Sequence, residues 1–170
     1  MIRFILVALS LIIYLVFFIP VMLILLLVKR FRSDISSSIA QTMVRNIFKL
    51  LLFFSGARVE VRGKENIPND RGVLFVSNHR SYFDILAGYG YTYKKIGFVA
   101  KYEMIHVPLL RQWMDLINCL FLNRENIKQG LKTILLGVEK VKSGVSIWIC
   151  PEGTRNLNAD VTDVKEFKDR

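Results

Sequence analysis

One of the two histidines of the chain lies in a pattern that suits acid–base chemistry. His79 precedes Asp84 by five residues. Five residues span about 500° of a continuous helix, so these two side chains can meet only if His79 precedes the helix. Ser81 followed by Asp84 is a helix-start signature and predicts a helix beginning near Ser81. Asp84 would then reach back to His79 and orient the imidazole, leaving its other nitrogen free as a general base. On the spacing alone, a helix cap beside a surface histidine is the favoured interpretation.

Two further polar clusters follow short apolar runs. Residues 123–126 (Asn-Arg-Glu-Asn) precede a predicted helix, and a helix start with an arginine is suited to binding phosphate. Residues 151–155 (Pro-Glu-Gly-Thr-Arg) predict a turn that presents Glu152, Thr154 and Arg155 together. Each cluster has a plainer interpretation, a capped strand end for the first and an exposed Glu–Arg pair for the second.

The elements that must position these clusters alternate between strand-like and helix-like patterns. Residues 58–62 alternate polar and apolar, and four short apolar runs follow, at 72–77, 96–100, 119–122 and 145–150. Helical patterns begin near residue 81 and cover 126–141. This alternation predicts an α/β fold with a mixed, largely parallel sheet flanked by helices. Ligand sites in such sheets lie beyond the carboxyl ends of the strands, where the three polar clusters fall.

The N-terminus of the 170-residue chain is strongly apolar. Of the first 28 residues 25 are apolar, and residues 4–28 carry no charge. At about 1.5 Å per residue this run reaches roughly 37 Å, enough for a ~30 Å hydrocarbon layer, with Pro20 as a kink. The length of the run favours an anchor over a cleaved signal peptide. Residues 1–32 are therefore predicted to be a transmembrane anchor, and Lys29, Arg30 and Arg32 place the rest of the chain on the cytoplasmic face.

The next segment, 33–56, has apolar residues at helical spacing. Ser33 or Asp34 is a candidate cap at its start, and Gly56 is expected to end it. Such a helix either packs on the following domain or lies in the lipid headgroup layer. Its position after an apolar span and its basic polar face favour the interfacial helix.

Charge and cysteine content limit the partners. The net charge of +10 is shared equally between residues 1–56 and 57–170. Aromatic–basic interleaving and a recognition helix are both lacking, which argues against nucleic acid. An anionic membrane or a phosphate-bearing substrate accounts for the charge. Cys119 and Cys150 lie in apolar segments and are expected to be buried thiols. No cluster of His, Cys or Asp residues has the spacing of metal ligands, so neither a metal nor another cofactor is expected.

Taken together, the clusters resemble the glycerolipid acyltransferase family. The residues that carry the resemblance are Asn78-His79-x-Ser81-x-x-Asp84, Lys101-x-Glu103, Phe121-Leu122-Asn123-Arg124 and Pro151-Glu152-Gly153-Thr154-Arg155. The resemblance covers about residues 59–156. It departs from the family pattern at Asn118, Asn123 and Cys150, where glycine, aspartate and phenylalanine are usual.

The resemblance implies a reaction and roles for residues. His79 would be the base and Asp84 its orienting partner in transfer of an acyl group from acyl-CoA or acyl carrier protein to the free hydroxyl of 1-acyl-glycerol-3-phosphate, giving phosphatidic acid. The acceptor's glycerol phosphate would be bound by Arg124, Glu152, Gly153, Thr154 and Arg155, with Lys101 as a further phosphate ligand on charge grounds. The alternatives are another lysolipid acceptor, such as lyso-ornithine lipid or a lysophospholipid, and an inactive membrane-bound fragment. The family's fourth motif, an apolar segment around a Val-Pro pair, is lacking, so the acyltransferase domain at 57–170 is expected to be C-terminally incomplete.

Overall fold

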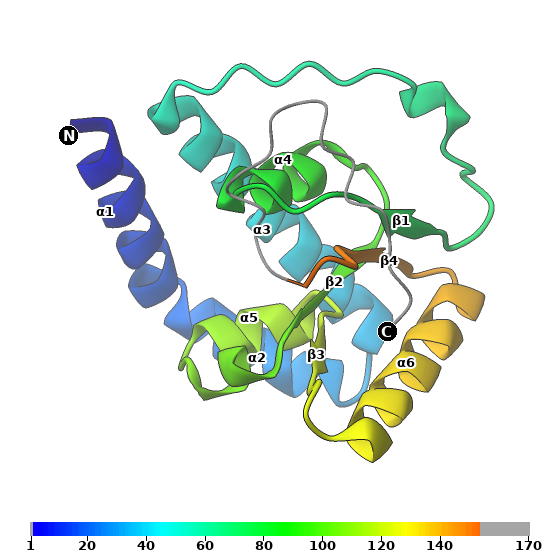
Figure 1. Cartoon of the computed structure of the whole chain (residues 1–170). Coiled ribbons are helices and arrows are strands. Elements are labelled where there is room, and N and C mark those ends of the chain that lie inside the picture. The colour runs from blue at the N-terminus through cyan, green and yellow to red at the C-terminus, as the bar shows by residue number, and fades with distance from the viewer. Residues whose placement is uncertain (1, 154–170) are drawn as a thin grey trace.

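The computed structural model describes residues 2–153 and contains one parallel sheet (Figure 1). The strands are β1 (Leu74–Val76), β2 (Ile96–Lys101), β3 (Leu120–Leu122) and β4 (Ser146–Ile149). Their order is β1-β4-β2-β3, and all three pairings are parallel. The expected α/β fold with a largely parallel sheet is thus confirmed. Parallel pairing brings the carboxyl ends of the strands to one edge, where the polar clusters begin.

Helices cover both faces of the sheet. They are α1 (Ile2–Phe17), α2 (Ile19–Lys29), α3 (Ser33–Ser55), α4 (Tyr82–Tyr91), α5 (Leu110–Leu116) and α6 (Ile127–Lys142), with short 3₁₀ turns η1 (Lys64–Asn66) and η2 (Tyr102–His106). On one face the rings of Phe75, Trp148 and Phe98 stack across three strands, and Tyr89 of α4 continues the row. On the other face α6 packs against β3 and β4, with Gly137 close to Leu120. Successive side chains of a strand point to opposite faces of the sheet. The ring row faces α4 and Leu120 faces α6, so these two helices lie on opposite faces.

The apolar N-terminus forms two helices that meet at a bend of 55°. Pro20 lies in the first turn of α2 and has no backbone N–H to donate to the preceding turn, so helix α1 ends at Phe17. The kink expected at Pro20 is therefore present, but the single continuous span is not confirmed. Within residues 2–153 no helix alone has the length and apolarity to cross a membrane, and only α1 and α2 as a bent pair meet that requirement.

Both N-terminal helices pack on the α/β domain. Tyr14 of α1 contacts Trp113 of α5, with the ring centroids 5.2 Å apart. At the end of α2 the ammonium of Lys29 lies 2.6 Å from the carboxylate of Asp115. The inner sides of α1 and α2 share the core of the domain, while many of their apolar side chains, such as Phe4 and Phe17, remain exposed.

Helix α3 packs on the domain through a face that is partly polar. Its buried residues include Ser36, Ser37 and Gln41 besides Ala40 and Val44. Gly56 ends the helix in the left-handed conformation, with φ of 75°, as expected. The cap expected at its start is wrong, because Arg32 takes the cap position and no side chain caps that end. Burial of one face is compatible with lipid contact at the other, so the interfacial role of residues 33–56 stays a prediction.

Gln41 joins α3 to the start of β2 through buried hydrogen bonds. Its amide nitrogen donates to the carbonyl of Ile96 at 2.9 Å, and its amide oxygen accepts from the Ile96 N–H at 3.1 Å. Substitution Gln41→Leu is expected to lower the free energy of unfolding by about 1–3 kcal/mol, because both backbone groups lose their buried partner. Chemical or thermal unfolding measures this. The exposed neighbour Thr42, replaced by alanine, is the control and should change stability by less than about 0.5 kcal/mol. Equal stabilities of the two variants would contradict the prediction.

Candidate active site at the carboxyl edge of the sheet

The predicted contact between His79 and Asp84 is present. Helix α4 begins at Tyr82 with Ser81 as its cap, so His79 lies in the loop that leads from β1 into the helix. The Nδ1 atom of His79 lies 3.2 Å from Oδ2 of Asp84. Both side chains are largely buried but remain open to solvent, at 18% and 27% exposure. With Nδ1 facing a carboxylate, the Nε2 atom is the nitrogen available to a substrate.

Asp84 also completes the start of the helix. Its Oδ2 atom accepts hydrogen bonds from the backbone N–H groups of Arg80 at 2.7 Å and Ser81 at 2.8 Å. The Ser81 side chain in turn accepts from the backbone N–H groups of Phe83 and Asp84, and its reciprocal contacts with Asp84 make a capping box. The helix cap and the histidine pair were alternatives in the sequence, yet one carboxylate does both. The cap fixes Asp84 and thereby fixes the position of the imidazole.

Removal of the Ser81 hydroxyl tests the cap of helix α4 separately from the contact between His79 and Asp84. Substitution Ser81→Ala is expected to cost about 0.5–2 kcal/mol of stability, because the Phe83 N–H loses its acceptor. Any activity of the folded protein should change only a few-fold, because the contacts of the Asp84 carboxylate with His79 and with the N–H groups of Arg80 and Ser81 do not involve the hydroxyl. Unfolding curves and kcat on the same preparation measure both. A loss of kcat at unchanged stability would show that Ser81 acts in the chemistry itself.

The second and third clusters meet at Gly153. The chain turns after β4, where the Gly153 N–H donates to the Cys150 carbonyl at 3.1 Å, and Gly153 adopts a φ of 72°. The guanidinium of Arg124 lies directly over Gly153, in the space that a Cβ atom would occupy. Arg124 follows β3, so its side chain reaches past β2 to the end of β4. Glycine is required here both for the turn and for the close approach.

Asparagines fix the loop that carries Arg124. The side chain of Asn126 accepts from the Gln129 N–H and caps α6, as expected for a helix start. Asn123 accepts from the N–H groups of Glu125 and Asn126. Asn123 thus holds the turn between β3 and α6 through backbone contacts, so that Arg124 projects from an ordered loop.

Lys101 ends β2 and pairs with a neighbour rather than with the other clusters. Its ammonium lies 2.9 Å from the carboxylate of Glu103. The hydrogen bond from Lys101 lowers the pKa of Glu103, and the positive charges of Lys101 and Arg124 add to this effect. The described contacts therefore place Lys101 in an ion pair at the site's margin, and its role in phosphate binding stays a prediction.

The sequence did not predict a polar contact that joins the ends of β1 and β4. Trp148 donates from its indole Nε1 to Ser77 Oγ at 2.6 Å, and Ser77 Oγ lies 3.4 Å from Cys150 Sγ. Ser77 directly precedes the loop of His79, and Cys150 precedes the turn of Gly153. These contacts tie the two loops together. The signal in the sequence was only a serine after one apolar run and a cysteine at the end of another, which is too common to indicate a contact.

The remaining expected site residues lie at or beyond the limit of the described structure. Glu152 is half-buried in the turn after β4, whereas Thr154 and Arg155 lie outside the described residues. Among residues 2–153 no group of three His, Cys, Asp or Glu side chains is placed to hold a metal ion. The arrangement therefore consists of a carboxylate-oriented imidazole after β1 and a guanidinium over the turn after β4. An oriented imidazole is chemically suited to act as a general base, and a guanidinium is suited to bind an anion.

Known proteins match both the sequence and the fold. The acyltransferase family model matches residues 58–169. The 1-acyl-sn-glycerol-3-phosphate acyltransferase of Borreliella burgdorferi is 30% identical over 73% of this chain and 50% of that protein. The human 1-acyl-sn-glycerol-3-phosphate acyltransferase beta is 30% identical over 67% of this chain and 41% of its own length. The chain thus spans about half the length of these relatives, or less.

A solved structure extends the match to the N-terminal helices. The 1-acyl-sn-glycerophosphate acyltransferase PlsC of Thermotoga maritima superposes with a TM-score of 0.64 at 26% identity, over 92% of this chain and 64% of that one. The sequence motifs had indicated the same family from the residues alone. The family model covers most of the chain, and its span includes the loops of His79, Arg124 and Gly153. The chain therefore belongs to the acyltransferase family.

Proposed function

We propose that the chain transfers a fatty acyl group to the free hydroxyl of 1-acyl-glycerol-3-phosphate, giving phosphatidic acid in phospholipid biosynthesis. The acyl donor in this proposal is the thioester of acyl-CoA or of acyl carrier protein. The names of the relatives support the acceptor, since each is named as an acyltransferase of 1-acyl-sn-glycerol-3-phosphate or of 1-acyl-sn-glycerophosphate.

One observation carries the proposal, namely the position of Arg124 relative to His79. The loop of His79 follows β1, and the turn of Gly153, over which the Arg124 side chain lies, follows β4. These two strands are neighbours and end at paired residues, Val76 and Ile149. Neighbouring strands are about 4.8 Å apart. A phosphate held by Arg124 over Gly153 would therefore be near a base on the next loop, as required for an acceptor whose hydroxyl and phosphate share one glycerol.

The proposed reaction balances with His79 as the proton carrier. Nε2 of His79 removes the proton of the acceptor hydroxyl while the oxygen attacks the thioester carbonyl carbon. Asp84 stabilises the imidazolium that results. When the carbon–sulfur bond breaks, the thiolate leaves and takes up the proton from His79. No covalent acyl-enzyme is needed, so Cys119 and Cys150 have no role as nucleophiles. Burial raises the pKa of Cys119 to about 12, which also makes its thiolate scarce.

A membrane position suits a lipid acceptor. In the proposal residues 1–32 anchor the chain, the outer side of 33–56 contacts headgroups, and the site lies on the cytoplasmic face. The many exposed apolar side chains on α1 and α2 support this position, because soluble monomers rarely expose apolar patches of this kind. The basic residues after α2 support the orientation.

An acceptor panel tests the proposal. Purified membranes containing the chain would receive one acyl donor at a time, acyl-CoA or acyl carrier protein, and one of three acceptors: lysophosphatidate, lyso-ornithine lipid or lysophosphatidylethanolamine. We expect lysophosphatidate to be acylated fastest. Preference for another acceptor would overturn the acceptor assignment and favour a different lysolipid acyltransferase. Lack of transfer to all three with both donors would favour an inactive membrane-bound protein.

A further inference from the structure

A cluster of cations surrounds Tyr93 at the amino-terminal end of β2, opposite to the active-site edge. Lys64 lies 3.5 Å from the centroid of the Tyr93 ring, Lys49 lies 5.5 Å from it, and Arg45 lies 5.9 Å from it. Lys49 also lies 5.5 Å from the ring of Tyr91. Three like charges are thus gathered within roughly one Debye length, about 10 Å at 0.1 M salt.

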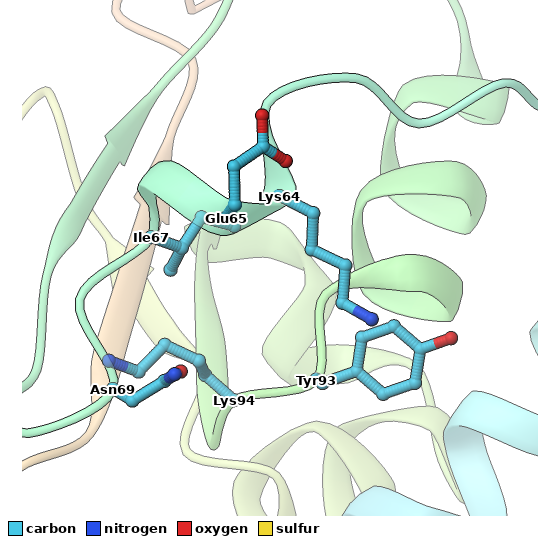
Figure 2. A pocket seen from close by; sticks show the side chains of 6 residues that line it. All are labelled: Lys64, Glu65, Ile67, Asn69, Tyr93 and Lys94. Carbon is cyan, nitrogen blue, oxygen red and sulfur yellow. The ribbon is translucent and has the colours of Figure 1, made fainter.

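The cluster borders a hollow to which Lys94 adds one further basic side chain. The hollow, of about 340 Å³, is lined by Lys64, Glu65, Ile67, Asn69, Tyr93 and Lys94 (Figure 2). Lys94 donates to the carbonyls of Pro68 and Arg71 and so holds the loop that forms one wall. The carboxylate of Glu65 points away from the Lys64 ammonium (Figure 2).

The positive charge of the cluster is not cancelled by acidic neighbours. Arg45 donates to the carbonyls of Thr92 and Lys94 and thereby contacts the C-terminal end of α4. Within residues 2–153 the ion pairs involve neither Arg45, Lys49 nor Lys64. Ring faces and carbonyl groups attract these cations but leave their formal charges in place. The surface therefore favours an anionic partner.

The neighbouring surface indicates what kind of anion this is. On α3 the side chain of Phe53 lies four residues after Lys49 and thus on the same side of the helix, and it is 74% exposed. The N-terminal end of α1 lies beside the C-terminal end of α3, since Arg3 approaches Gly56 (Figure 1). The exposed apolar side chains of α1 thus continue this surface. Cations at the rim of an apolar surface match a bilayer with anionic lipids.

We propose that Arg45, Lys49 and Lys64 around Tyr93 form a binding surface for the phosphate groups of anionic lipid headgroups. The proposal rests on the membrane contact of the proposed function and adds a charged contact that orients the domain on the bilayer. It places this contact at the end of the sheet opposite to His79. The surface is thereby distinct from the proposed acceptor site at Arg124.

Vesicle binding tests this surface. The full chain would be floated with phosphatidylcholine vesicles that contain or lack phosphatidylglycerol. Variant Lys49→Gln/Lys64→Gln is expected to bind the anionic vesicles about 20-fold more weakly, since each basic residue near an anionic surface contributes about fivefold. Binding to neutral vesicles should not change. The matched control Lys128→Gln/Lys132→Gln removes the same charge from exposed positions of α6 and should bind as the unmodified chain does.

Three outcomes would overturn the proposal. Equal weakening in both double variants would show that only net charge matters, and unchanged binding in Lys49→Gln/Lys64→Gln would show that the cluster does not contact lipid. Displacement of the unmodified chain by inorganic phosphate, beyond that by chloride at equal ionic strength, would indicate a site for free anions.

Acyl transfer to lysophosphatidate in neutral detergent micelles separates the two proposals. Activity should be equal in the unmodified chain and in Lys49→Gln/Lys64→Gln, and a loss in the variant would assign the cluster to the acceptor site instead. Failure of the unmodified chain to transfer acyl groups would refute the proposed function and leave the vesicle result standing.

Discussion

Replacement of His79 by glutamine is expected to lower kcat for acyl transfer about 10²–10⁴-fold, the range usual for loss of a general base. Glutamine is close to histidine in size and still forms hydrogen bonds, but it cannot take up the hydroxyl proton at neutral pH. The KM for the acceptor should change much less, since the proposed phosphate contact comes from Arg124 on another loop. Steady-state kinetics with lysophosphatidate and an acyl thioester measure both constants.

The second histidine provides a matched control. His106 ends η2, where its ring lies edge-on to Tyr102, and it has no carboxylate partner in the described ion pairs. Substitution His106→Gln should leave kcat within about twofold. If His79→Gln retained a kcat near that of the unmodified chain, the acid–base role of His79 would be refuted and the capping role of Asp84 would be the only one left.

Replacement of Gly153 by alanine is expected to raise the KM for the acceptor about tenfold or more. The added methyl group would occupy the position of the Arg124 guanidinium and displace it from the turn. Loss of one hydrogen bond to a charged group costs about 1.5–3 kcal/mol, which corresponds to roughly 10–150-fold in affinity. Kinetics with varied acceptor at saturating donor measure the effect.

The variant Gly144→Ala is a control that separates the effect of backbone strain from the effect of displacing Arg124. It also has a positive φ, of 91°, but a Cβ atom there would meet nothing within 4 Å. Variants Gly144→Ala and Gly153→Ala should therefore lose similar stability, about 1 kcal/mol, through strain, and only Gly153→Ala should raise KM. Equal KM values in the two variants would contradict the close approach of Arg124 as the cause.

Local signals in the sequence predicted local structure well. Ser81 and Asp84 predicted the start of α4, Gly56 the end of α3, and Pro20 the break between the first two helices. Each of these residues acts on backbone groups within a few positions of itself, so its effect hardly depends on the rest of the fold. Residues 58–62, by contrast, alternate like a strand but form none, because no described strand pairs with them.

Features that depend on tertiary contacts could not be predicted from the sequence. The apolar residues of α3 predicted its buried side, yet Ile39 and Phe53 are exposed while Ser36 and Gln41 are buried. Ser36 and Gln41 are buried because they hydrogen-bond to the backbone of α2 and β2, partners that the spacing cannot reveal. Likewise, the meeting of Arg124 with Gly153 depends on the strand order β1-β4-β2-β3 and on a side chain that reaches past one strand.

The packing of α1 and α2 on the domain has a practical consequence for anyone who wishes to shorten the protein. Removal of residues 1–32 would take away the Tyr14 ring from Trp113 and the Lys29 ammonium from Asp115. It would also expose apolar core side chains of α3 and α5, and it would leave the Ser36 hydroxyl without the Leu25 carbonyl. The shortened chain would be less stable and more prone to aggregate. The apolar N-terminal helices are therefore a part of the protein's own core, and detergent rather than deletion is the way to bring this protein into solution.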